Sequence, residues 1–124
     1  MENTRKPFQV WEVNGEEYKL KLKTSSIIKL EEKFKTGLMN LIQIGDNLPP
    51  LNIMLQVTHA AMKDWNNSIK LEKVYDLFDS YCEEGGSQLD FYQNIYIGIF
   101  TVSGFFTTSM AAEMEKKLEQ IEEV

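Results

Sequence analysis

Residues 71–106 read LEKVYDLFDSYCEEGGSQLDFYQNIYIGIFTVSGFF, and this stretch decides the fold class. Its first part, residues 71–82, carries apolar side chains at the spacing of one helical face. Gly85-Gly86 then predicts the end of that helix, because glycine readily adopts the left-handed conformation found there. The Ser-x-x-Asp pattern of Ser87–Asp90 has the form of a capping box, and it predicts a second helix that extends to about Ser103.

The spacing within these two helices predicts which side chains face the core. In the first helix they are Leu71, Val74, Tyr75, Phe78, Tyr81 and Cys82. In the second helix they are Leu89, Tyr92, Ile95, Tyr96 and Ile99. Because Phe78 and Tyr81 are neighbours of Cys82, its thiol is expected to be buried and to behave as a small apolar group.

Asn14-Gly15 predicts a β-hairpin near the N-terminus, because a type I′ turn needs positive φ at both central residues. A two-residue turn sets Val13 opposite Glu16, Trp11 opposite Tyr18, and Gln9 opposite Leu20. The face predicted to be apolar carries Trp11, Val13, Tyr18, Leu20 and Leu22, and the other face carries Phe8, Val10, Lys19, Lys21 and Lys23. Since a lone hairpin is marginal in water, this one should lie on helices or extend the sheet of a partner.

Further helices are predicted between these two regions. Thr24, Ser25 or Ser26 is expected to cap a helix that carries Phe34 and stops near Gly37. Residues 38–44 form a short apolar segment with helical character, and the sequence GDNLPP then breaks the chain. Residues 51–65 are apolar nearly all round, so they should form the central helix.

The C-terminal segment, residues 107–124, is rich in helix formers and in glutamate, and it follows a possible hinge at Gly104. One helical stripe carries Met110, Met114, Leu118 and Ile121. This helix either packs on the core or ends in a frayed tail, or it is mobile and docks in a groove of a partner or neighbouring subunit. Phe105 and Phe106 lie either at the joint before it or in the core.

These elements together predict a single α+β domain that is mainly α-helical, with an N-terminal hairpin and a C-terminal amphipathic helix. The predicted division is a core of residues 1–106 followed by an acidic helix of residues 107–124. The chain of 124 residues is long enough for one core of its own.

Composition and the scarcity of reactive side chains argue against an enzyme. The net charge is -6, which argues against nucleic acid as the main partner, and the acidic C-terminal segment disfavours anionic membrane surfaces. The single histidine, His59, and the single cysteine, Cys82, suit structural roles. The carboxylates Glu72, Asp76, Asp79 and Glu83 line one helical face, and they are expected to form a solvated face.

No catalytic residue, cofactor, metal site or small-molecule substrate is therefore predicted. The N-terminal sequence lacks the apolar run of a signal peptide, and no stretch approaches the roughly 18 apolar residues of a membrane span. A cytoplasmic location is the expectation.

The order of these features resembles the tail assembly chaperones of long-tailed, siphovirus-type phages and prophages of Gram-positive bacteria. The matching segments are YKLKLKTSSIIKLEEKF, LPPLNIMLQVTHAAM, VYDLFDSYCEEGGS and VSGFF. The resemblance as a whole covers almost the entire chain, roughly from Phe8 to Phe106. Each segment alone is a generic amphipathic element, and their order carries the resemblance.

The resemblance implies a role in the host cytoplasm without catalysis. Members of that family are thought to coat the tape measure protein, to keep it soluble, and to help recruit tail tube subunits during tail morphogenesis. They are absent from the finished particle, and many have a short form and a longer frameshifted form. Tape measure protein and tail tube protein are thus the implied partners, and self-association is expected as well.

A chaperone for a long amphipathic helix needs exposed apolar surface bordered by charge. The residues expected to bind the partner are Phe105, Phe106, Met110, Met114, Leu118 and Ile121. The outer face of the hairpin is a further candidate. Two other classes remain open: a structural subunit such as a minor tail or head-tail connector protein, and an acidic adaptor or regulator.

Overall fold

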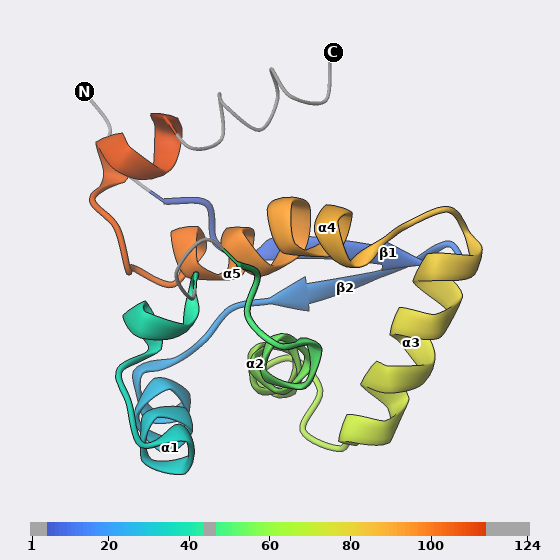
Figure 1. Ribbon diagram of the computed structural model, residues 1–124, viewed down its shortest axis with the longest axis horizontal. Coiled ribbons are helices and arrows are strands. Elements are labelled where there is room, and N and C mark those ends of the chain that lie inside the picture. The colour runs from blue at the N-terminus through green and yellow to red at the C-terminus, as the bar shows by residue number, and fades with distance from the viewer. Residues whose placement is uncertain (1–4, 44–46, 114–124) are drawn as a thin grey trace.

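A two-stranded hairpin lies between helices in the computed structural model of the chain, which describes residues 5–43 and 47–113 (Figure 1). Strands β1 (Gln9–Val13) and β2 (Glu16–Leu20) pair antiparallel. A continuous helical rod, formed by α4, η2 and α5, runs along one side of the hairpin, and α2 crosses on the other side. The α+β prediction of a single, mainly helical domain with an N-terminal hairpin is confirmed.

The hairpin has the predicted turn and register. Asn14 and Gly15 adopt φ values of 55° and 79°, as a type I′ turn requires. Trp11 pairs with Tyr18, and Gln9 pairs with Leu20. The predicted inner face is the buried one: Trp11, Val13, Leu20 and Leu22 are buried, and Tyr18 is half-buried. The hairpin therefore lies on helices of its own chain, which was one of the two alternatives.

The first helix, α1 (Thr24–Phe34), forms without the predicted side-chain cap. The N-cap position is Lys23, and Thr24, Ser25 and Ser26 already belong to the first turn. The backbone N–H of Lys23 instead donates to the Asp64 carboxylate at 3.1 Å, across 41 positions of sequence. The capping prediction was wrong because this tertiary contact fixes the entry to the helix.

A short 3₁₀ helix, η1 (Leu38–Leu41), occupies the predicted apolar segment after α1, and its N-terminal N–H, that of Leu38, donates to the Glu31 carboxylate at 2.8 Å. After the prolines, α2 (Leu51–Lys63) lies in the centre of the fold. Its side chains Met54, Val57 and Ala61 are fully buried, which confirms its predicted central position.

Helix α3 (Leu71–Glu83) ends as predicted but buries a different set of side chains. Gly85 has φ of 108°, and the N–H of Gly86 donates to the Tyr81 carbonyl, so the glycine pair closes the helix. Val74, Leu77 and Phe78 are buried. Tyr75 and Cys82, predicted to face inward, are exposed.

The last helical rod comprises α4 (Gln88–Phe91), the π-helical turn η2 (Tyr92–Tyr96) and α5 (Ile97–Val102). The Ser87 hydroxyl accepts from the N–H of Asp90 at 3.1 Å, which confirms the predicted cap. Leu89 is 52% exposed, whereas Phe91 is fully buried. The spacing prediction failed at Leu89 because a π turn holds an extra residue, which shifts the buried face relative to a regular α-helix.

Candidate partner-binding surface

The structure describes three of the six side chains predicted to bind a partner. Phe105 and Phe106 are half-buried, and Met110 is 50% exposed. Met114, Leu118 and Ile121 lie outside the described residues. The predicted division of the chain into residues 1–106 and 107–124 stays a prediction.

Phe105 and Phe106 pack on the core while part of each ring stays accessible. The Phe105 ring meets Phe100 edge to face, with 4.7 Å between ring centroids. The N–H of Phe105 donates to the Phe100 carbonyl at 3.3 Å. Aromatic pairs of this geometry add roughly 0.5–1.5 kcal/mol beyond area burial, so the pair fixes the chain as it leaves α5.

A sharp turn connects α5 to the next helical residues. Gly104 adopts φ of 91°, a conformation that favours glycine. Just before it, the Ser103 hydroxyl accepts from the N–H of Leu22 at 2.9 Å, so the turn is tied to the end of the hairpin. Residues 108–113 are helical, and the Thr107 hydroxyl caps them by accepting from the N–H of Met110 at 3.1 Å.

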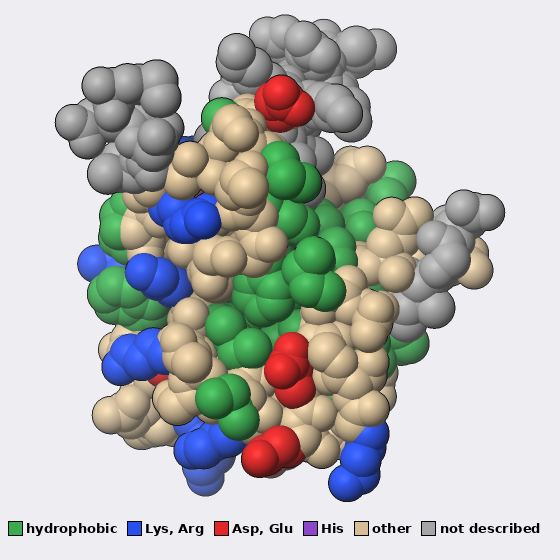
Figure 2. Space-filling view, turned by 90° about the vertical axis from the view of Figure 1, so that its left-hand side faces the viewer, with side chains coloured by type: hydrophobic (Ala, Val, Ile, Leu, Met, Phe, Trp, Pro, Cys, Tyr) green, Lys and Arg blue, Asp and Glu red, His purple; other side chains and the backbone are tan. Residues whose placement is uncertain are grey.

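Hydrophobic side chains gather at the centre of the face shown in Figure 2, with Lys and Arg side chains mainly to their left and below. This view looks onto the side of Figure 1 where α1, η1 and residues 103–113 lie. The partly exposed hydrophobic side chains of these elements are Ile27, Ile28, Phe34, Met39, Phe105, Phe106 and Met110. We call this set the apolar face. Periodicity predicts Met110, and the joint before that helix suggested Phe105 and Phe106, but the contribution of α1 and η1 depends on tertiary packing.

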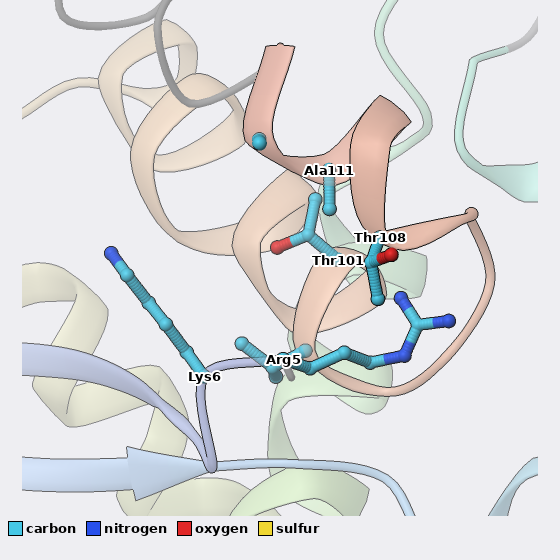
Figure 3. A pocket seen from close by; sticks show the side chains of 7 residues that line it. Arg5, Lys6, Thr101, Thr108 and Ala111 are labelled. Carbon is cyan, nitrogen blue, oxygen red and sulfur yellow. The ribbon is translucent and has the colours of Figure 1, made fainter. Parts of the chain in front are cut away.

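A small pocket of about 90 Å³ lies between the N-terminal segment and residues 101–112 (Figure 3). Thr101 and Ala111 line it from the helices, and Arg5 extends beneath them toward Thr108. Lys6 points away to the other side in the same view. The pocket thus separates Arg5 from the helical residues 108–113 and from the end of α5.

The outer face of the hairpin carries an aromatic cluster that the sequence analysis missed in part. Trp65, 48% exposed, meets the Phe8 ring edge to face at 5.5 Å between centroids. The Lys19 ammonium lies 4.9 Å from the Phe8 centroid and 5.2 Å from the Trp65 centroid. Phe8 and Lys19 were placed on this face by alternation, but Trp65 follows α2, and no local pattern predicted its arrival here.

The remaining candidate reactive side chains lie on two helices, His59 on α2 and Cys82 with the four carboxylates on α3. The His59 ring is hydrogen-bonded through Nε2 to the Ile69 carbonyl at 2.9 Å. Cys82 was predicted to be buried but is exposed, and residual burial together with Asp79 raises the pKa of its thiol. The four carboxylates of α3 are exposed, as predicted for a solvated face.

Two further findings concern only the described parts of the chain. In residues 5–43 and 47–113, no group of His, Cys, Asp and Glu side chains is placed to hold a metal ion. Over the same residues, no helix is both long and apolar enough to cross a membrane.

Comparison with known proteins gives a family without an assigned function. Neither the curated proteins nor the solved structures include a match to this chain. A model described as a family of unknown function, DUF6096, matches residues 4–124. Because that match covers nearly the whole sequence, the chain belongs to the DUF6096 family.

Proposed function

We propose that this protein is a non-catalytic tail assembly chaperone of a phage or prophage. In this proposal it binds the tape measure protein in the host cytoplasm, keeps it soluble, and helps recruit tail tube subunits. The four segments whose order resembles tail assembly chaperones support the proposal, and they are spread between Tyr18 and Phe106.

The observation that carries the proposal is the apolar face, bordered by charged side chains, on a chain of net charge -6. Met39 and Met110 are 55% and 50% exposed. Monomeric soluble proteins rarely leave contiguous apolar surface of this kind uncovered unless it binds something. Methionine suits a surface that must accept different stretches of a long client, because its side chain is unbranched and adaptable.

Charge has a separate part in the proposed mechanism. A chaperone that coats an apolar helix must keep the complex soluble, and a surplus of negative charge does so by mutual repulsion between complexes. Each contact with the apolar face can be weak, because several copies along one client bind by avidity. Half-buried aromatic rings such as Phe105 and Phe106 would add contact area with little loss of side-chain entropy.

The proposal is tested by following the protein through tail assembly. In cells producing phage particles, an affinity-tagged copy should co-purify with the tape measure protein before tails are complete. Mass spectrometry of purified particles should then find the tape measure protein but not this chain. If purified particles instead retain this chain at a fixed ratio, the protein is a minor tail or head-tail connector subunit.

The adaptor or regulator alternative predicts a different outcome. Such a protein would co-purify with neither tape measure nor tail tube protein, and its deletion would leave tails of normal length. The proposed chaperone predicts that deletion abolishes tails while heads still form, with the tape measure protein recovered in the insoluble fraction.

A further inference from the structure

Three segments distant in sequence meet at the aromatic end of the outer hairpin face. They are residues 7–8 before β1, residues 19–23 at the end of β2, and Asp64-Trp65 after α2. The hydrogen bond from the Lys23 N–H to the Asp64 carboxylate ties the second segment to the third. The Trp65 N–H donates to the Met62 carbonyl at 3.0 Å, so the backbone under the indole is fixed as well.

The Trp65 side chain is accessible even though its surroundings are ordered. The indole and the Phe8 ring meet edge to face, and the Lys19 ammonium lies over both rings. Nearly half of the tryptophan is still exposed, at 48%. A cleft of about 440 Å³ beside it is lined by Pro7, Lys21, Lys23, Asp64 and Trp65. A pre-positioned tryptophan next to a hollow is the usual anchor of a protein–protein contact.

Charge along the outer hairpin face is divided between its two ends. Lys19, Lys21 and Lys23 follow one another at alternate positions beside the aromatic cluster, whereas Glu12 and Glu17 pair near the turn. Asp64 is the acidic residue that lines the cleft, and its carboxylate accepts from the Lys23 backbone. The aromatic end therefore presents net positive charge on a protein whose overall charge is -6.

We propose that this aromatic and lysine surface, formed by Phe8, Lys19, Lys21, Lys23 and Trp65, binds an acidic segment of a partner protein that carries aliphatic side chains. An aliphatic side chain would pack on Trp65 and enter the cleft, while neighbouring carboxylates would pair with the lysines. None of these five residues belongs to the apolar face, so the site would hold a second segment or a second partner.

A nucleic-acid strand would fit this surface less well than an acidic peptide. Phosphate binding needs cations along the whole track of the backbone, but Glu12 and Glu17 occupy the other end of the face. Stacking platforms for single strands also use several exposed rings in succession. Here one ring, that of Trp65, is largely accessible, and Phe8 supports it from the edge.

The test adds synthetic peptides to the whole chain. Binding is monitored in NMR spectra through the indole N–H signals of the two tryptophans. The probe is a short peptide of glutamates with leucines at helical spacing. There are two control peptides. In one, alanine replaces every leucine of the probe, and in the other, lysine replaces every glutamate. Binding of the probe should shift the Trp65 signal and leave that of buried Trp11 in place. Either control peptide should bind about tenfold more weakly, because it lacks the anchor or the charge.

Two pairs of variants distinguish specific binding at this site from general electrostatic attraction between the peptide and the protein. Lys19→Glu should weaken binding of the probe about tenfold, whereas the same change at exposed Lys29 on α1 should alter it less than about twofold. Trp65→Ala lacks the reporting indole signal, so its binding is measured by the fluorescence anisotropy of a labelled probe. It should abolish binding, whereas Tyr75→Ala, at an exposed ring on α3, should not. Circular dichroism of each variant checks that the fold is retained.

Four results would overturn the proposal, three with added ligands and one without. The first is equal binding of the glutamate and lysine peptides, and the second is equal loss of binding at Lys19 and Lys29. The third is tighter binding of an oligothymidine than of the acidic peptide, which would make the surface a nucleic-acid site. A concentration-dependent shift of the Trp65 signal without any peptide would show instead that a second copy of the chain occupies the surface.

Discussion

A single buried tyrosine joins the last helical rod to the first half of the chain. The Tyr96 hydroxyl donates to the Leu41 carbonyl at 2.7 Å across 55 positions of sequence, and the side chain is fully buried. Its ring also contacts Phe100 at 5.0 Å between centroids. The Tyr96 side chain thus supplies a hydrogen-bond donor to the last carbonyl of η1 and fills the core beside α5.

Replacing this tyrosine by phenylalanine tests the hydrogen bond alone. Tyr96→Phe should lower the free energy of unfolding by about 1–2 kcal/mol, because the Leu41 carbonyl loses its donor inside the core. Urea denaturation followed by circular dichroism measures the change. The matched control is Tyr75→Phe, at a ring that is 40% exposed, and it should cost less than about 0.5 kcal/mol. Equal costs at the two positions would contradict this role for Tyr96.

The dependence of stability on alkaline pH tests the burial of the same Tyr96 side chain. Burial raises the pKa of Tyr96 in the folded state, so its neutral form is the one the fold favours. The stability this contributes is complete below the ordinary tyrosine pKa of about 10 and is lost as pH rises above it. The free energy of unfolding should therefore fall less steeply above that pH in Tyr96→Phe than in the wild type. Identical slopes would count against a buried neutral phenol.

Cys82 provides a second test at the scale of one residue. Because its thiol is exposed, a disulfide-exchange reagent should label it in the native protein without denaturant. The raised pKa of the thiol should make labelling slow near neutral pH and faster toward pH 9. Labelling that appears only in urea would restore the original expectation of a buried cysteine.

At the scale of whole elements, the sequence predicted those turns and helix ends whose conformation depends only on residues next to one another in the chain. The Asn14-Gly15 turn, the hairpin register and the Gly85-Gly86 helix end depend on conformations of the residues that form them. The start of α1 depends on a distant partner, Asp64, and the buried face of the last rod depends on the π turn η2. Regular helical spacing contains no information about either, so the predictions for the α1 cap and for Leu89 failed.

The same reasoning applies to the candidate surface. Met110 was predicted from spacing, because the hydrophobic positions of the C-terminal segment repeat along one stretch of sequence. Trp65 was not predicted, because its neighbours Phe8, just before β1, and Lys19, in β2, are far away in sequence. Surfaces assembled from several segments need the tertiary arrangement before they can be recognised.

The cap of α4 gives a prediction for one element. Ser87→Ala should lower the free energy of unfolding by about 1 kcal/mol, because the Asp90 N–H would lose its acceptor at the helix start. Ser87→Thr keeps an oxygen at that position and should recover most of the loss. Thermal unfolding of the two variants beside the wild type measures the difference. A threonine variant as unstable as the alanine variant would argue against capping as the cause.

At the scale of the whole molecule, the apolar face and the net charge should contribute separately to function. Met110→Glu places a carboxylate in the apolar face at a half-exposed position, so stability should change by less than about 0.5 kcal/mol while client binding falls. Leu89→Glu is the matched control, since Leu89 is equally exposed, at 52%, but lies on α4 outside that face. Equal loss of client binding in both variants would locate the client contact elsewhere.

The most direct test of the chaperone proposal is the solubility of the tape measure protein from the same genome when it is co-expressed with this chain. The proposal predicts that most of the tape measure protein becomes soluble and elutes in size-exclusion chromatography together with several copies of this chain. A tape measure protein that stays insoluble and unbound while this chain is folded and abundant would contradict the proposal.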